Sequence, residues 1–217
     1  MGKSMQGIHG NWWGRVGNIV GRMSQGRTIY SIYQPNVHNP KTAAQVTART
    51  KFGLVTHFLA GASAYIAKGF RGLDGYKYGN PYSAAVGYNC KINNIIIHNQ
   101  QTNTDSVDYT LAVLSEGSVD LPYSPNATAD GTTLSLTWAD NSGMGNAETD
   151  DMAMVAVYNP TKNQWIFNTS LAERNERNGT FALPTAWTGD TVNVWMSMYR
   201  EKNNEASKST FLASLPL

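Results

Sequence analysis

The chain has 217 residues, of which 41% are hydrophobic, and its 17 Lys and Arg residues nearly balance its 15 Asp and Glu residues. This composition excludes an intrinsically disordered chain, which combines low hydrophobicity with high net charge. The single cysteine, Cys90, excludes an internal disulfide framework. No signal-peptide-like run follows the first residues, and no stretch approaches the roughly 20 apolar residues of a membrane span. We expect a folded protein that is made in a cytosol and has no membrane partner.

The net charge of +2 conceals a division of charge along the chain. Residues 1–100 contain eleven basic residues and one acidic residue, whereas residues 101–217 carry a net charge of −8. Such asymmetry indicates an acidic partner for the basic part, which includes nonspecific proximity to DNA, or a head-to-tail contact between copies. Independent drift in the composition of two domains remains the alternative explanation.

Glycines punctuate residues 1–38, and two strand-like runs lie among them, residues 15–21 and 28–33. The intervening Ser24-Gln25-Gly26-Arg27 is typical of a turn, so the pattern predicts a β-hairpin. Because a lone hairpin is marginally stable in water, we expect this one to pack on its own helices or on another subunit. The neighbouring Trp12 and Trp13 are candidates for core packing or for anchoring in a neighbour.

Two Asn-Pro pairs predict helix starts, since Asn caps free amides and Pro favours the first helical position. Asn39-Pro40 opens a helix that we expect Gly53 to interrupt or bend, followed by a helical stretch that ends near Gly69. Asn80-Pro81 opens a shorter helix toward Asn94. We expect residues 95–97 to form its buried end or a short strand.

From about residue 106 the pattern changes to period two, which predicts strands. Leu134, Leu136 and Trp138 should share one face of their strand, and the Met-rich strand that ends at Arg200 should bury one face. Residues 125–131 read as a turn. The expected strands are residues 107–114, 132–138, 151–158, 163–168, 179–183, 191–200 and 208–213.

Seven short strands in about 110 residues are typical of an immunoglobulin-like sandwich, and the Trp that closes the second strand resembles the core Trp of fibronectin type III domains. The predicted fold class is therefore α+β. The predicted domains are a basic β-hairpin arm with helices over residues 1–105 and an acidic β-sandwich over residues 106–217.

An ordered set of motifs resembles a family of uncharacterised domains from Bacteroidota and their phages, including crAss-like phages. The set spans nearly the whole chain and contains a Gly-rich start, a Pro-led helix with Thr-x-x-Gln and Arg-x-x-Phe, and several strand motifs. In this sequence these are residues 34–45 with Arg49 and Phe52, Asp151 with Val155, Val157, Tyr158 and Asn159, Leu183-Pro184, Trp187, Gly189-Asp190, and residues 207–210. The resemblance implies a small non-enzymatic structural protein of the virion.

No motif in the sequence indicates catalysis or a cofactor. The four histidines, His9, His38, His57 and His98, lack the clustered spacing of a zinc site. The acidic loop that contains Glu148, Asp150 and Asp151 could hold Ca²⁺, but it lacks the alternating pattern of a calcium loop and a solvated turn is the simpler interpretation. We therefore predict no enzyme activity, no metal and no cofactor.

The leading hypothesis is a phage virion structural protein, a neck or tail ring subunit that contacts other copies of itself and other virion proteins. The alternative is a head fibre, decoration or surface-binding module that uses exposed aromatics such as Trp165 or Trp187. The candidate partner-contact residues lie in the basic half: Trp12, Trp13, Arg15, Arg22, Arg27, Arg49 and Lys51.

Overall fold

A computed structural model describes residues 3–4, 10–24, 26–36, 39–71, 80–91 and 94–217. The fold is mixed but rich in strands, which form several antiparallel sheets. The chain divides into two compact units, residues 1–45 and 46–217. The expected domain boundary between residues 105 and 106 falls inside the second unit. The helices after residue 45 therefore belong with the strands that follow them.

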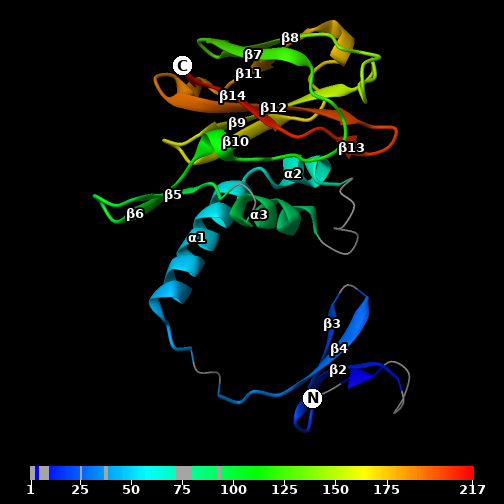
Figure 1. The fold of residues 1–217 in the computed structure, drawn as a ribbon, viewed down its shortest axis with the longest axis vertical. Helices are drawn as coiled ribbons and strands as arrows, with labels where there is room; N and C mark the ends of the chain where they lie inside the picture. Colours follow the sequence, from blue (N-terminus) through cyan, green and yellow to red (C-terminus); the bar gives the residue numbers. More distant parts are fainter. Residues whose placement is uncertain (1–2, 5–9, 25, 37–38, 72–79, 92–93) are drawn as a thin grey trace. The chain divides into compact units, whose positions relative to one another are not determined.

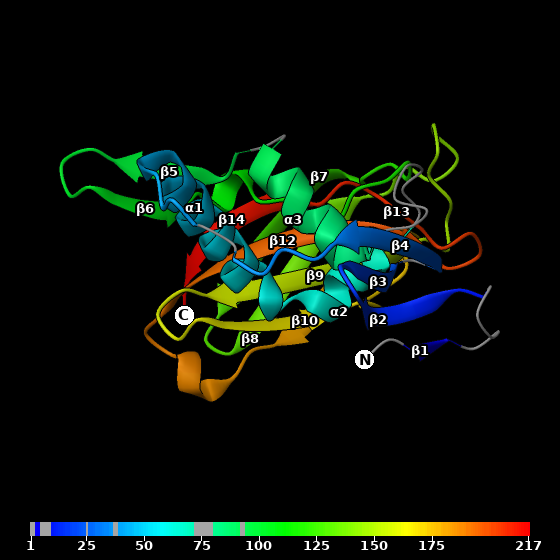
Figure 2. The same ribbon diagram turned by 90° about the horizontal axis from the view of Figure 1, so that it is seen from below.

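The first unit is a four-stranded sheet with the order β1-β2-β3-β4 (Figure 2). Its strands are β1 (Lys3–Ser4), β2 (Trp12–Val16), β3 (Ile19–Ser24) and β4 (Arg27–Ile32). The prediction of one strand over residues 15–21 is wrong, because Gly17 adopts a φ of 57° and closes a tight turn between β2 and β3. The expected hairpin is therefore a meander in which β3 pairs on both sides.

Three helices open the second unit, α1 (Ala43–Ala60), α2 (Ser63–Gly69) and α3 (Pro81–Lys91). Asn80 caps α3 as predicted, accepting a hydrogen bond of 3.0 Å from the Tyr82 amide. The expected interruption at Gly53 is wrong, since α1 runs through it without a break. A β-hairpin follows, formed by β5 (Ile96–Asn99) and β6 (Thr104–Val107).

Two sheets make up the rest of the second unit. One has the order β10-β9-β12-β13 with β14 also paired to β12, and the other has the order β11-β8-β7. The strands are β7 (Tyr123–Asp130), β8 (Thr133–Ala139), β9 (Met152–Asn159), β10 (Gln164–Asn168), β11 (Asn178–Ala182), β12 (Thr191–Arg200), β13 (Glu205–Ala206) and β14 (Thr210–Pro216). Short 3-10 turns lie at Tyr109–Leu111, Arg174–Glu176 and Thr185–Trp187.

One strand prediction and one turn prediction are wrong in this region. Residues 107–114 form the end of β6 and a 3-10 turn rather than a strand, and Asp108 caps that turn through the Thr110 amide at 2.9 Å. Residues 125–131 were expected to be a turn because of their Pro, Asn and Gly, yet most of them lie in β7. β7 is an edge strand of its sheet, where a proline is tolerated.

The five-stranded sheet is buried on both faces, so the second unit has three layers (Figure 1). Val155 and Met196 face the three-stranded sheet, where they meet Leu134, Leu136 and Trp138, as the alternation predicted. The opposite face packs against the helices through a second set of side chains from β9 and β12: Met154, Ala156, Tyr158, Trp195 and Tyr199.

Polar contacts join the helices to this sheet. The buried Tyr65 hydroxyl of α2 lies 2.5 Å from the Ser197 hydroxyl of β12. The Trp165 indole of β10 donates to the Phe58 carbonyl of α1 at 2.7 Å. Because burying an unpaired polar group is costly, these bonds fix how the helices sit on the sheet. None of the helices in the described ranges combines the length and hydrophobicity that crossing a membrane requires.

Candidate assembly surface

The sheet of residues 1–45 has one apolar face and one basic face. The register pairs Val16 with Ile19 and Ile19 with Ile32, so these three side chains lie in one row on one face. Met23 and Tyr30 follow on the same face, since alternate residues of a strand point to the same side. The opposite face carries three basic residues, Arg15, Arg22 and Arg27, and also Val20 and Ile29, of which Ile29 is 40% exposed.

The apolar face is exposed to an unusual degree. Ile32 is 67% exposed, Met23 is 60% exposed and Val16 is 53% exposed. Large apolar side chains gathered on one face, rather than scattered singly, mark an interaction surface. Within the described part of this unit, Gly21 is the sole buried residue. This sheet therefore forms no hydrophobic core of its own from the residues that the structure describes.

Trp12 packs across the same face near the centre of the sheet. Its ring lies 4.9 Å from the Tyr30 ring, and the Tyr30 hydroxyl accepts a hydrogen bond from the Trp12 amide at 3.4 Å. A side chain at Gly21 would stand 2.9 Å from a Trp12 ring carbon and would also collide with the Trp12 carbonyl. Gly21 is therefore required for Trp12 to cross the sheet. Trp13 lines a neighbouring hollow of about 550 Å³ together with Met23.

The basic face is organised around Arg15. Its guanidinium lies 3.6 Å from the centre of the Tyr33 ring, and its Nε donates to the Gly17 carbonyl at 3.0 Å. Arg22 and Arg27 are exposed on the same face. Residues 1–45 contain five basic residues and no acidic residue. This face is therefore positively charged without compensation from its own unit.

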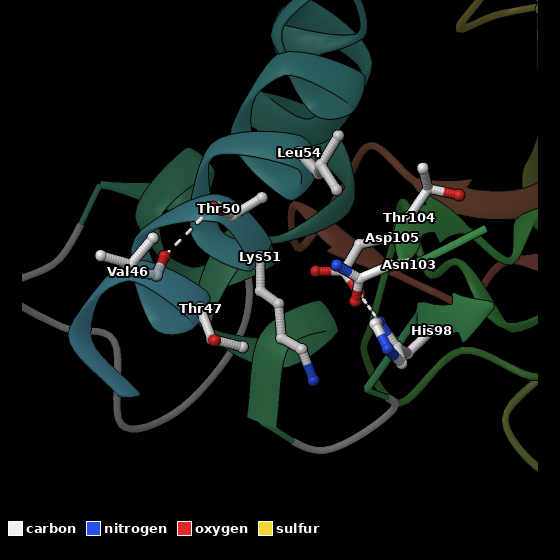
Figure 3. A pocket seen from close by; sticks show the side chains of 9 residues that line it. All are labelled: Val46, Thr47, Thr50, Lys51, Leu54, His98, Asn103, Thr104 and Asp105. Atoms are coloured by element: carbon white, nitrogen blue, oxygen red, sulfur yellow. Dashed lines mark hydrogen bonds and ion pairs between the residues drawn. The ribbon is translucent and has the colours of Figure 1, made fainter. Parts of the chain in front are cut away.

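Arg49 and Lys51 lie on α1, in the other unit. Lys51 lines a groove of about 880 Å³ between α1 and the β5–β6 hairpin, and its side chain extends into that groove (Figure 3). Across the groove His98 Nδ1 lies 2.7 Å from a carboxylate oxygen of Asp105. Arg49 is exposed and does not line the groove. The seven predicted contact residues thus divide between the two units, five in residues 1–45 and two on α1.

The acidic loop is neither a calcium loop nor a solvated turn at Asp151, which corrects both interpretations. Asp151 is fully buried between two arginines. Its carboxylate accepts from Arg174 at 2.8 Å, from Arg200 Nε at 2.9 Å and from the Glu148 amide at 2.9 Å. A second Arg200 nitrogen, Nη2, donates to it at 3.2 Å, so the carboxylate accepts four hydrogen bonds from protein groups.

The aromatic residues considered for surface binding are not exposed. Trp187 is 1% exposed and belongs to the core between the two sheets. Trp165 is half-buried and lies 4.8 Å from the Tyr158 ring and 5.1 Å from the Phe58 ring. Both side chains are therefore used in packing, so the two aromatics named as examples for the surface-binding alternative are not exposed binding groups.

The remaining candidate ligands lie apart. His57 Nε2 lies 2.7 Å from the side-chain amide nitrogen of Asn163. His9 and His38 fall outside the described residues. Within the part of the chain that the structure describes, no three His, Cys, Asp or Glu side chains are grouped to hold a metal ion. Cys90 is half-buried on α3, and burial raises the pKa of its thiol.

Five of the seven predicted contact residues therefore lie together, in one sheet. The apolar row of Val16, Ile19 and Ile32 was missed, because treating residues 15–21 as one strand hides which side chains share a face. The Gly17-Asn18 pair was the signal that could have revealed it, since a Gly-containing pair between two strand-like runs predicts a tight hairpin turn.

Comparison with curated proteins finds no significant match to this chain. A model of a family of unknown function, DUF6266, matches residues 11–213, which include β2, β3 and β4 as well as nearly all of the second unit. The amphipathic sheet and the three-layered unit are thus parts of one family domain, and the chain belongs to the DUF6266 family.

Proposed function

We propose that this chain is a non-enzymatic structural subunit of a bacteriophage particle, which joins copies of itself and other virion proteins into a ring at the neck or tail. The observation that carries the proposal is the exposed apolar face of the sheet in residues 1–45. A small sheet needs a packed hydrophobic face to be stable, and the described residues of its own unit do not cover this face. A neighbouring subunit supplies the missing cover.

The charges of the two units support contacts between copies. Residues 1–45 carry five positive charges and no negative charge, whereas residues 46–217 contain twelve basic and fifteen acidic residues. Opposite net charges on two different surfaces favour a heterologous contact, which closes into a ring when the rotation allows it.

The basic face of the sheet in residues 1–45 could also lie beside DNA in the particle. Such a contact would weaken with salt, and binding titrations at two salt concentrations would test it.

We also propose that residues 123–217 form a sandwich of the fibronectin type III kind. Its support is the strand order, in which β7, β8 and β11 match strands A, B and E, while β9, β10, β12 and β14 match C, C′, F and G. In a virion subunit such a module serves as a rigid body that carries the sheet of residues 1–45, which we call the assembly sheet. An experimental structure with a different strand order would contradict this assignment.

The test of the proposed function removes the apolar row without touching the second unit. The double variant Ile19→Ser with Ile32→Ser exposes polar groups on the face, so we expect the wild-type chain to form oligomers and the variant to remain monomeric in analytical ultracentrifugation. Because both side chains are already exposed, the change should alter the stability of the isolated chain by no more than about 0.5 kcal/mol each.

Ile97→Ser is the matched control, since Ile97 is 49% exposed on β5 and lies outside the assembly sheet. This variant should assemble like the wild type. A wild-type chain that stays monomeric at its highest soluble concentration would contradict the proposal. Equal assembly of the double variant and the wild type would contradict it as well.

A further inference from the structure

The basic face of the assembly sheet combines positive charge with an exposed apolar side chain. The register pairs Arg22 with Ile29 across two strands, and Arg27 lies two residues before Ile29 on the same face. Ile29 is 40% exposed, and both arginines are exposed as well. Protein interfaces commonly have an apolar centre and a polar rim. This second face of the sheet therefore also has the character of a contact surface.

The charges that complement this face lie in the second unit. Residues 1–73 contain nine basic residues and no acidic residue, whereas residues 92–161 contain nine acidic residues and no Lys or Arg. A positively charged surface favours a negatively charged partner surface and disfavours one of its own sign. The strands and loops of residues 92–161 therefore offer the complement of the basic face.

Two exposed apolar side chains meet within that range. Tyr123 is 55% exposed and Met144 is 58% exposed, and the Tyr123 hydroxyl donates to the Met144 sulfur at 3.7 Å. Met144 belongs to the loop of residues 140–151. This loop lies at the end of the sheets where β12 ends, since Arg200 donates to Asn146 at 2.7 Å (Figure 1). Large apolar side chains that gather on a surface mark an interaction site.

Two carboxylates flank this apolar pair. Asp120 accepts a hydrogen bond of 2.6 Å from the Asn146 amide, two residues after Met144. Asp140 accepts one of 2.9 Å from the Ser142 amide, two residues before Met144. The apolar pair and the carboxylates together form what we call the receiving surface: Asp120, Tyr123, Asp140 and Met144.

The arginines near the receiving surface leave it negatively charged. Arg174 and Arg200 are buried, and both pair with Asp151. Arg177 lies 3.9 Å from Asp140 and offsets part of its charge. Asp120 forms no ion pair with any residue that the structure describes. The receiving surface is thus apolar at its centre and acidic at its rim, as the basic face is apolar at its centre and basic at its rim.

We infer that the basic face of the assembly sheet in one copy docks on the receiving surface of the next copy. This inference rests on the proposed function and names the surface that the sheet contacts. The occupant is a second copy because both the charges and the apolar centres match, and two different surfaces on each copy give a head-to-tail series. A DNA backbone would match the charge of the basic face but would place phosphates against the exposed Ile29.

Charge variants of the full-length protein test this contact by analytical ultracentrifugation. Arg22→Glu reverses a charge of the basic face, and Asp120→Asn with Asp140→Asn neutralises the receiving surface but keeps a side-chain oxygen as acceptor. Each variant alone should associate at least about tenfold more weakly than the wild type. An equimolar mixture should associate more strongly than either variant, because the first retains its receiving surface and the second retains its basic face.

Two matched controls change a charge elsewhere on the chain. Asp130→Asn lies at the other end of β7, and Lys91→Glu lies at the end of α3; both side chains are exposed. Both controls should assemble like the wild type. Met144→Ser removes the apolar centre and changes no charge, so it tests the receiving surface independently of the carboxylates and should also weaken association by about tenfold or more.

Three results would overturn the inference. A mixture that associates no better than its components would place the contact within one chain. Loss of DNA binding by Arg22→Glu with full assembly would assign the basic face to DNA. Wild-type assembly of the Arg22, Asp120–Asp140 and Met144 variants, with a monomeric Ile19→Ser and Ile32→Ser double variant, would reject the receiving surface and leave the proposed function standing.

Discussion

The carboxylate of Asp151 is fully buried, and the guanidinium groups of Arg174 and Arg200 neutralise its charge. Arg174 is also fully buried and donates to the Asn141 side chain at 2.6 Å and to the Asp120 carbonyl at 2.7 Å. Arg200 donates to the Asn146 side chain at 2.7 Å. Burial by itself lowers the pKa of Arg200, but the hydrogen bonds and charge of Asp151 raise it above its usual value. The group therefore ties the loop of residues 140–151 to β12.

We expect Asp151→Asn to destabilise the protein by about 3–5 kcal/mol, because it removes the carboxylate that pairs with the fully buried Arg174. Arg200 also loses this partner but keeps Glu148 at 3.5 Å and Glu205 at 4.0 Å. Chemical denaturation followed by tryptophan fluorescence measures the change. Asp150→Asn is the control, since Asp150 is exposed beside it and its replacement should change stability by about 0.5 kcal/mol or less. Similar effects of the two substitutions would show that the buried pair contributes little.

At the scale of elements, two glycines, one inside α1 and one directly after it, have opposite roles. A side chain at Gly53 would meet nothing within 4 Å, whereas one at Gly61 would stand 2.6 Å from a ring carbon of Trp165. Trp165 cannot move aside easily, because it packs against Phe58 and lies 5.3 Å from the Trp195 ring. Gly61 is thus required where the chain passes from α1 to α2, and Gly53 is not.

Gly53→Ala should stabilise the protein by about 0.5–1 kcal/mol, because alanine restricts the unfolded chain and favours the helix. Gly61→Ala should destabilise it by about 1–3 kcal/mol through overpacking against Trp165. Thermal unfolding by circular dichroism compares the two variants directly. The assignment of a continuous α1 would be wrong if Gly53→Ala were as destabilising as Gly61→Ala.

The elements also show what could be predicted from the sequence. The strands β8, β9, β10, β11 and β12 lie within two residues of their predicted positions, because period-two alternation is a local signal. β7 was missed because turn-forming residues on an edge strand imitate a loop. The burial of the second face of β12, where Trp195 packs against the helices, was not predicted. It results from tertiary packing, and the local sequence pattern does not show which layer covers a strand.

The residues of the candidate assembly surface could likewise be predicted from the sequence only in part. The basic residues Arg15, Arg22 and Arg27 were identified from composition, since charge can be counted along the chain. The apolar row depends on register, and a shift of one residue moves every side chain to the other face. The buried role of Asp151 depends on Arg174 and Arg200, which are distant in sequence and carry no shared motif.

At the scale of the whole molecule, the two units differ in how they are held together. Residues 46–217 contain both hydrophobic clusters, one between the two sheets and one between the five-stranded sheet and the helices. Among the residues of 1–45 that the structure describes, none belongs to either cluster. The second unit should therefore fold by itself, and the first should serve contacts between molecules.

Removal of residues 1–38 tests this division, because it deletes the assembly sheet and keeps Asn39 and Pro40 ahead of α1. We expect the truncated chain to unfold cooperatively with a denaturation midpoint close to that of the full chain, since both clusters remain. We also expect it to be monomeric where the full chain forms oligomers. Loss of cooperative unfolding would show that residues 1–38 complete the fold of the same molecule, and assembly of the truncated chain would place the contacts between copies on the second unit.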